Sequence, residues 1–86
     1  MRSARFNKDV IVTNHARERM AERDIDDAAL LDVIETGQIR RIDREHLFIF
    51  KQIQGRRDNL VCAAAVEEGY LVIKTVLVNW TLRELR

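Results

Sequence analysis

The sequence of 86 residues has little cysteine and histidine and no long apolar run. Cys62 is the single cysteine and cannot form an intramolecular disulfide, which favours a reducing cytoplasm. With His15 and His46 far apart, these residues do not make a zinc site, so we expect no metal. No stretch approaches the roughly 20 apolar residues of a membrane-spanning helix. Because the N-terminus also lacks an apolar signal segment, we expect a cytoplasmic protein without a membrane partner.

Several motifs of common enzyme classes are missing as well. There is no glycine-rich phosphate loop, no G-x-S-x-G motif and no proline, and we expect no cofactor. The formal net charge of +1 argues against a surface that binds nucleic acid everywhere, although a local basic patch remains compatible with it. Residues 24–36 contain five acids and no basic residue, whereas residues 40–57 contain six basic residues and two acids. Any basic surface should therefore lie on the middle of the chain.

The composition itself is that of an ordinary folded protein. Apolar residues make up 47% and charged residues 34% of the sequence. We therefore expect a single domain over residues 1–86, in which the polar residues 1–9 form a loose N-terminal arm. The β-branched run Val10–Val12 then predicts a short strand.

Two helices are predicted between residues 13 and 37. Thr13 or Asn14 can cap the first helix, which should end near Asp24. Asp26 can cap a second helix, along which apolar residues recur at three- and four-residue spacing. Gly37 is expected to close that helix as a C-terminal residue that is able to take a positive φ.

After residue 38 the apolar pattern takes a period of two, which predicts strands. Runs joined by such short turns must pair antiparallel, because a parallel pair needs a crossover of about a dozen residues. The predicted fold is α+β, with two N-terminal helices packed on a four-stranded antiparallel β-meander, or a five-stranded one if Val10–Val12 joins an edge. Since two helices cover one face, the C-terminal segment or a homodimer should cover the other. The four predicted strands are Ile39–Arg41, His46–Ile53, Asn59–Val66 and Tyr70–Trp80.

The first helix carries a polar stripe that is a candidate site. At about 3.6 residues per turn, His15, Arg19 and Arg23 share one face. Two guanidiniums can bind an anion, and a neutral imidazole near a helix N-terminus can act as a general base. In the alternative interpretation the arginines pair with nearby acids such as Glu22 and Asp27 and hold the helices together. From the residues alone, this structural interpretation is favoured.

Further candidates lie on the predicted strands. Arg41, Arg44 and His46 belong to the basic middle of the chain and could follow a phosphate backbone, although such charges more often form a solvated face. The Arg56–Arg57 pair is most simply a hairpin tip. Lys74 and Thr75 interrupt an apolar run. A buried lysine must be paired and is a functional candidate, whereas a lysine on an edge strand would discourage aggregation.

The first helix also carries a family resemblance, through a motif of the form THAxxRMxERxI. Followed by a helix that ends in Gly37 and by a β-meander, this motif resembles a family of small bacterial domains of unknown function. That family is grouped with the RelE, ParE and BrnT-like toxins and with the barnase–colicin-type nuclease fold. Several proteins of the wider group cleave messenger or transfer RNA and are held inactive by an antitoxin, whereas ParE-like proteins act on gyrase. The motif residues are Thr13, His15, Ala16, Arg19, Met20, Glu22, Arg23 and Ile25.

The resemblance implies a toxin-like, metal-independent endoribonuclease or a degenerate relative, with RNA and an antitoxin as partners. Metal-free RNA cleavage needs a base for the 2′-OH, a cation for the charge on the phosphorane and an acid for the leaving oxygen. His15 would be the catalytic base or acid, and Arg19 and Lys74 would stabilise charge. Asp24 stands where the family usually has glycine, so the turn between the helices is expected to differ. Binding would fall to Arg23, Thr75, Arg41, Arg44 and His46. The alternative is a non-catalytic interaction module.

Overall fold

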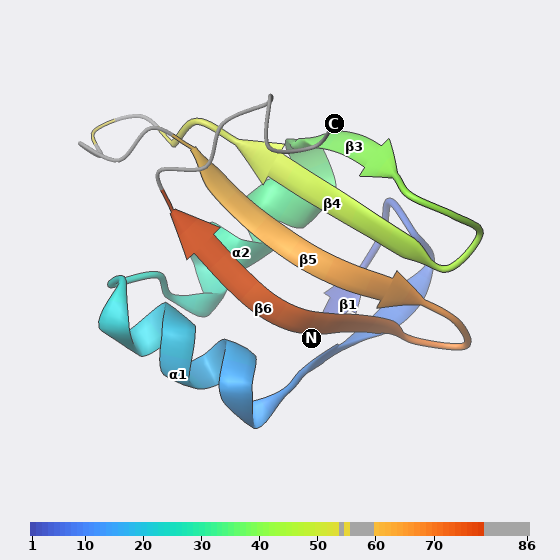
Figure 1. Cartoon of the computed structure of the whole chain (residues 1–86), viewed down its shortest axis with the longest axis horizontal. Coiled ribbons are helices and arrows are strands. Elements are labelled where there is room, and N and C mark those ends of the chain that lie inside the picture. Colours follow the sequence, from blue (N-terminus) through green and yellow to red (C-terminus); the bar gives the residue numbers. More distant parts are fainter. Residues whose placement is uncertain (54, 56–59, 79–86) are drawn as a thin grey trace.

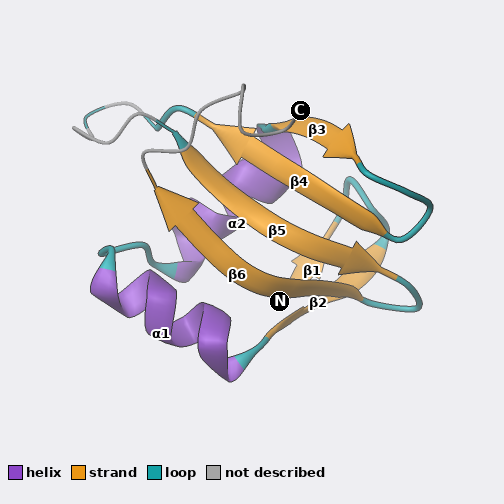
Figure 2. Cartoon of the chain, viewed as in Figure 1, coloured by secondary structure: helices purple, strands orange, loops and turns teal. Residues whose placement is uncertain are grey.

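The protein is an α+β domain built on one mixed sheet (Figure 1). The computed structural model describes residues 1–53, 55 and 60–78. In these residues two helices lie between the second and third of six strands, and the strand order in the sheet is β1-β2-β6-β5-β4-β3 (Figure 2). The elements are β1 (Arg2–Ser3), β2 (Lys8–Val12), α1 (Asn14–Glu22), α2 (Asp27–Thr36), β3 (Gln38–Arg41), β4 (His46–Lys51), β5 (Val61–Glu67) and β6 (Leu71–Val78).

The predicted antiparallel sheet of four or five strands is wrong. The described residues form six strands, and β2 runs parallel to β6, with Val10 opposite Leu71 and Val12 opposite Ile73. Only β3 to β6 form an antiparallel meander. The parallel pair is reached through a crossover that contains both helices and three strands, so short-range spacing could not reveal it. The predicted strand ends at Asn59 and Trp80, the Arg56–Arg57 tip and the C-terminal segment lie outside the described residues.

The N-terminal residues 1–9 are not a loose arm, because β1 pairs antiparallel with β2 and the turn between them is fastened to α2. The carboxylate of Glu35 accepts hydrogen bonds from the backbone N–H groups of Ala4 and Arg5, at 2.7 and 2.8 Å. The Arg5 guanidinium in turn donates to two carbonyls at the C-terminal end of α2, at 3.1 and 2.6 Å. It thus satisfies acceptors that a helix end leaves free. These contacts join residues about thirty positions apart, so the polar sequence of the arm gave no sign of them.

Side-chain caps start both helices as the sequence predicts. The Thr13 Oγ1 accepts a hydrogen bond from the N–H of Ala16 at 3.1 Å, and the Asp26 Oδ1 accepts one from the N–H of Ala29 at 2.8 Å. Between the helices, Asp24 has a φ of +54°, in the left-handed region that glycine favours. The turn therefore keeps a glycine-like backbone without the glycine.

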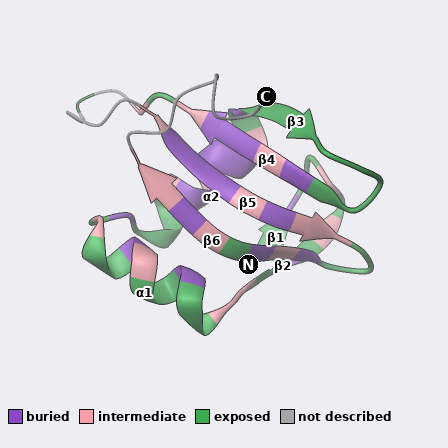
Figure 3. Ribbon diagram, viewed as in Figure 1, coloured by how far each residue is buried: buried purple, intermediate pink, exposed green. Residues whose placement is uncertain are grey.

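The two faces of the sheet differ in what covers them. Both helices share one core with β2, β4, β5 and β6, which includes Met20 of α1, Leu30 of α2 and Ile49 of β4 (Figure 3). Side chains alternate along a strand, so the residues between these core positions point to the opposite face. We call this opposite surface of β4, β5 and β6 the open face. It carries a second, smaller cluster of Phe50 and Cys62 with Phe48, Leu60 and Leu77 packed against it.

Gly37 ends α2 as predicted, but it does not use the positive φ that a glycine can take. Its φ is −72°, an ordinary value for any residue. The glycine is required for another reason: a Cβ at this position would lie 2.5 Å from the carbonyl oxygen of Val33 and 2.8 Å from that of Phe50. The absence of a side chain therefore allows the end of α2 to lie against β4. The other face of β4 forms part of the candidate site.

Candidate functional site

The open face is hollowed over β4, β5 and β6. The hollow has a volume of about 190 Å³, and its walls are largely apolar. For comparison, an engineered cavity of roughly 150 Å³ in another protein accepts a benzene ring. Of the lining residues only His46 and Lys74 carry polar side chains, so the hollow has room for a planar ring beside an imidazole and an ammonium. The lining residues are Ile42, His46, Leu47, Phe48, Ala64, Ala65, Val66 and Lys74.

An irregularity in β6 places Lys74 at the hollow. Thr75 lies opposite Ala64 and Ile73 lies opposite Ala65, which leaves Lys74 as an extra, unopposed residue, as in a β-bulge. Ile73 is buried in the core beneath the helices, whereas Lys74 is exposed. Within the part of the chain that the structure describes, its ammonium has no hydrogen bond or ion pair. Lys74 is thus neither a buried, paired lysine nor on an edge strand, since β6 lies between β2 and β5.

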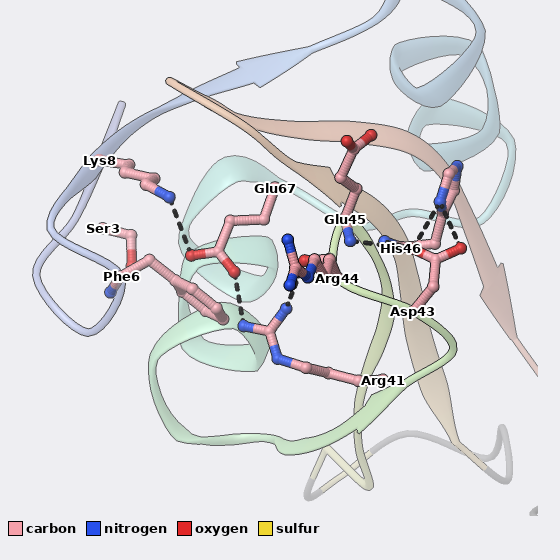
Figure 4. A network of polar contacts seen from close by, with 9 residues as sticks. All are labelled: Ser3, Phe6, Lys8, Arg41, Asp43, Arg44, Glu45, His46 and Glu67. Carbon is pink, nitrogen blue, oxygen red and sulfur yellow. Dashed lines mark hydrogen bonds and ion pairs between the residues drawn. The ribbon is translucent and has the colours of Figure 1, made fainter.

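His46 is the first residue of β4 and lines the hollow from there, and its ring pairs with Asp43 in the preceding turn (Figure 4). The ring Nδ1 lies 3.0 and 3.1 Å from the two carboxylate oxygens of Asp43. The Oδ1 also accepts hydrogen bonds from the backbone N–H groups of His46 and Glu45, at 2.8 and 2.9 Å. These hydrogen bonds lower the pKa of Asp43 to about 2. The largest contributions come from the backbone N–H groups of His46 and Glu45, and a smaller one comes from the imidazole. Asp43 is therefore ionised at neutral pH and can only accept hydrogen bonds.

A second polar network at the same end of the sheet accounts for Arg41. The Glu67 carboxylate of β5 accepts hydrogen bonds from Arg41 of β3 at 2.5 Å and from Lys8 of β2 at 3.0 Å (Figure 4). The side chain of Glu67 is only 16% exposed. The hydrogen bond from Arg41 outweighs the opposing effect of burial, and with the bond from Lys8 it lowers the pKa of Glu67. Arg41, a predicted ligand-binding residue, is thus already engaged in holding three strands together.

Acid is expected to weaken this network. A carboxyl whose pKa is lowered by folding stabilises the fold fully above its unfolded pKa, and this contribution disappears as the pH falls through the folded value. Glu67→Gln should therefore reduce the free energy of unfolding by on the order of 1 kcal/mol at neutral pH, and by much less near pH 3. Urea unfolding at both pH values measures the difference, with Glu68→Gln on the exposed turn as the control. Equal losses at the two pH values would contradict this role.

The predicted stripe on α1 is largely an ion network. Arg19 and Arg23 both pair with Glu22, Arg23 at 3.5 Å. Arg17 of α1 pairs with Asp27, the first residue of α2. His15 is exposed and, among the described residues, makes no hydrogen bond or ion pair. The pairing with Glu22 agrees with the structural interpretation but lies within α1, and the pair with Asp27 joins the two helices. The catalytic roles of His15 and Arg19 stay predictions.

The structure thus separates the predicted site residues into groups. His46 of β4 and Lys74 of β6 line the same hollow on either side of β5. Thr75, which follows Lys74 in β6, is half-buried opposite Ala64. Arg44 is exposed in the turn between β3 and β4. The remaining residues belong to the α1 stripe or to the Glu67 network. Sequence reasoning missed Asp43, although an aspartate three residues before a histidine in a polar turn is a local signal that could have identified it.

The described residues offer neither a membrane-spanning helix nor a cluster of metal ligands. No helix in residues 1–53, 55 and 60–78 is long and apolar enough to cross a membrane. The same residues contain no group of three or more histidine, cysteine, aspartate or glutamate side chains that could hold a metal ion.

A family model described as a domain of unknown function, DUF4258, matches residues 12–78. The chain is a member of the DUF4258 family. No curated protein and no solved structure matches it. The DUF4258 match runs from the end of β2 to the end of β6 and so covers both the α1 stripe and the hollow. It confirms the resemblance to a family of domains of unknown function, and the relation to toxins stays a prediction.

Proposed function

We propose that this DUF4258 domain binds RNA at the hollow of the open face and cleaves it without a metal ion, as a toxin-like ribonuclease. The observation that carries the proposal is the meeting of His46, Lys74 and Phe48 on one apolar surface. An imidazole and an ammonium are groups that metal-free RNA cleavage requires, and an aromatic ring can stack an unpaired base.

The reaction assigns a role to each of these residues. The Nε2 of His46 removes the proton from a 2′-OH, whose oxygen attacks the adjacent phosphorus. Lys74 stabilises the negative charge that grows on the phosphorane oxygens. The bond from phosphorus to the 5′-oxygen then breaks, and that oxygen takes a proton from solvent water. The products are a 2′,3′-cyclic phosphate and a 5′-hydroxyl end.

Charge favours the hollow over the α1 stripe as the site of this reaction. In the stripe, Arg19 and Arg23 share the carboxylate of Glu22, which offsets their attraction for a phosphate. Lys74 has no such partner among the described residues. Arg40 adds a further positive charge, because it lies opposite Phe48 in the β3–β4 pair and therefore on the same face. A strand of RNA with its base over Phe48 thus has cations on either side.

The same surface bears on protein partners. If the domain is toxin-like, an antitoxin that covers the open face would exclude RNA, and acidic residues would suit Lys74 and Arg40. A homodimer through this face would bury the same cations, and the described strands present no acidic side chain on it to pair with them. We therefore propose the antitoxin and not the homodimer as the protein partner of this surface.

Cleavage of RNA by the purified wild-type protein in excess EDTA tests the proposal. A 5′-labelled single-stranded RNA should yield fragments that end in 2′,3′-cyclic phosphates, whereas DNA of the same sequence should stay intact because it lacks the 2′-OH. His46→Ala purified in parallel reveals any contaminating ribonuclease. Equal cleavage of DNA, or failure of the folded wild type to cleave a pool of random RNA sequences, would overturn the proposal.

A non-catalytic interaction module is the second candidate function. The observation in its favour is the α1 ion network, in which Arg19 and Arg23 hold Glu22 and do not face a ligand alone. In that case the hollow would receive an apolar side chain of a partner protein. The second function would be favoured if the folded protein leaves both RNA and DNA uncleaved in EDTA, whether or not it binds RNA.

A further inference from the structure

We propose that Asp43 is a positioning residue that fixes the tautomer of His46, so that Nε2 is the proton acceptor at the hollow. The effect of Asp43 on catalysis rests on the proposed function. The assignment of the His46 tautomer does not depend on that function, because it follows from the contact between the two side chains. It assigns a role to a turn residue that contacts the ring of His46 and does not line the hollow itself.

The argument begins with which atom carries the proton. An ionised carboxylate has no hydrogen to donate, and both oxygens of Asp43 lie within hydrogen-bond distance of Nδ1. Nδ1 must therefore be the protonated nitrogen of the neutral ring. The lone pair is then left on Nε2, the other ring nitrogen of a side chain that lines the hollow. The low pKa of Asp43 means that its carboxylate remains a hydrogen-bond acceptor throughout the neutral range.

The turn also prevents the carboxylate from swinging away. Two backbone N–H groups, those of Glu45 and His46, hold Oδ1 from within the turn. The backbone carbonyl of His46 accepts hydrogen bonds from the N–H groups of Ile42 and Asp43, at 2.9 and 3.4 Å, which closes the same turn. Both partners of the ring contact are therefore fixed to one short segment at the start of β4. Such support by a second residue is what holds a catalytic imidazole in one orientation.

Asp43→Asn is the variant that separates orientation from folding. The carboxamide oxygen can still accept the two backbone N–H groups, so the turn should remain. Its NH₂ group, however, can donate to Nδ1, which would move the ring proton to Nε2 and abolish the acceptor at the hollow. An equivalent change in serine proteases lowers kcat strongly through the wrong tautomer. We expect kcat for RNA cleavage to fall by at least about tenfold, with little change in KM.

Nitrogen-15 NMR of the histidine side chains of the full chain is the decisive measurement. In the wild type, His46 should be mainly the Nδ1–H tautomer, and in Asp43→Asn mainly the Nε2–H tautomer. His15 serves as an internal reference that should not change. Asp27→Asn, which removes an exposed carboxylate paired with an arginine of α1, is the matched control and should leave His46 unaltered.

The outcomes separate this inference from the proposed function. A wild-type His46 that is mainly Nε2–H, or a tautomer that Asp43→Asn leaves unchanged, would overturn the role of Asp43 whether or not RNA is cleaved. The expected tautomer change combined with a wild type that cleaves no RNA would support the positioning role and overturn the ribonuclease. A change in both the tautomer and kcat would support the positioning role of Asp43 and the ribonuclease activity together.

Discussion

Replacing His46 by alanine is expected to reduce the rate of RNA cleavage by about 10²–10⁴-fold, the usual contribution of a positioned acid or base. The variant removes the imidazole that lines the hollow and leaves Lys74 and Phe48 in place, so RNA binding should weaken much less than the rate. His46 is exposed and lies outside both apolar clusters, and the fold should therefore survive. Single-turnover cleavage of a labelled RNA, with thermal unfolding as a check on the fold, measures the effect.

His15→Ala is the matched control for this experiment. It removes the other histidine of the chain, which the sequence placed in the catalytic role through the α1 motif. If the hollow is the site, His15→Ala should cleave RNA at close to the wild-type rate. The reverse result, in which His15→Ala is inactive and His46→Ala is active, would move the site to α1 and restore the assignment made from the resemblance.

Local features of the fold were predictable because their causes lie within a few residues. Thr13 and Asp26 cap their helices through hydrogen bonds three positions along the chain. Contacts between distant segments were not predictable in this way. The parallel pairing of β2 with β6 and the fastening of Arg5 to the end of α2 depend on where the completed sheet brings the N-terminus. The Arg5 contact leaves no local pattern in a polar arm without periodicity, and the spacing within Val10–Val12 does not show which strand it pairs with.

The same division applies to the candidate site. A periodic pattern could show that His15, Arg19 and Arg23 share a helical face, but it could not weigh their attraction for a ligand against the pairing with Glu22. The placement of His46 and Lys74 at one hollow, in contrast, could not be read from a periodic pattern. It depends on the register between β5 and β6 and on the extra residue in β6, neither of which is encoded by spacing within one strand. Helical stripes are therefore easy to predict and sites assembled across strands are not.

Gly37→Ala is expected to lower the free energy of unfolding by roughly 1–3 kcal/mol, the usual cost of forcing extra volume into a packed site. The added Cβ would meet the carbonyl oxygens of Val33 and Phe50, and both are backbone atoms that cannot turn aside as a side chain can. Relief of the contact with Val33 requires the last turn of α2 to distort, and relief of the contact with Phe50 requires α2 and β4 to separate. Since Arg5 donates to the carbonyl of Gly37, such a shift would also disturb the cap at the end of α2.

Gly69→Ala is the control, because a Cβ at that glycine would meet no atom within 4 Å. Urea unfolding of the two variants beside the wild type measures the difference, and equal stabilities would contradict the close approach at Gly37. The comparison also bears on function. Gly37 precedes β3, and β3 with β4 frames the turn that holds Asp43 and His46. At temperatures where Gly37→Ala remains folded, a loss of cleavage would mean that the packing of α2 on β4 sets the position of His46.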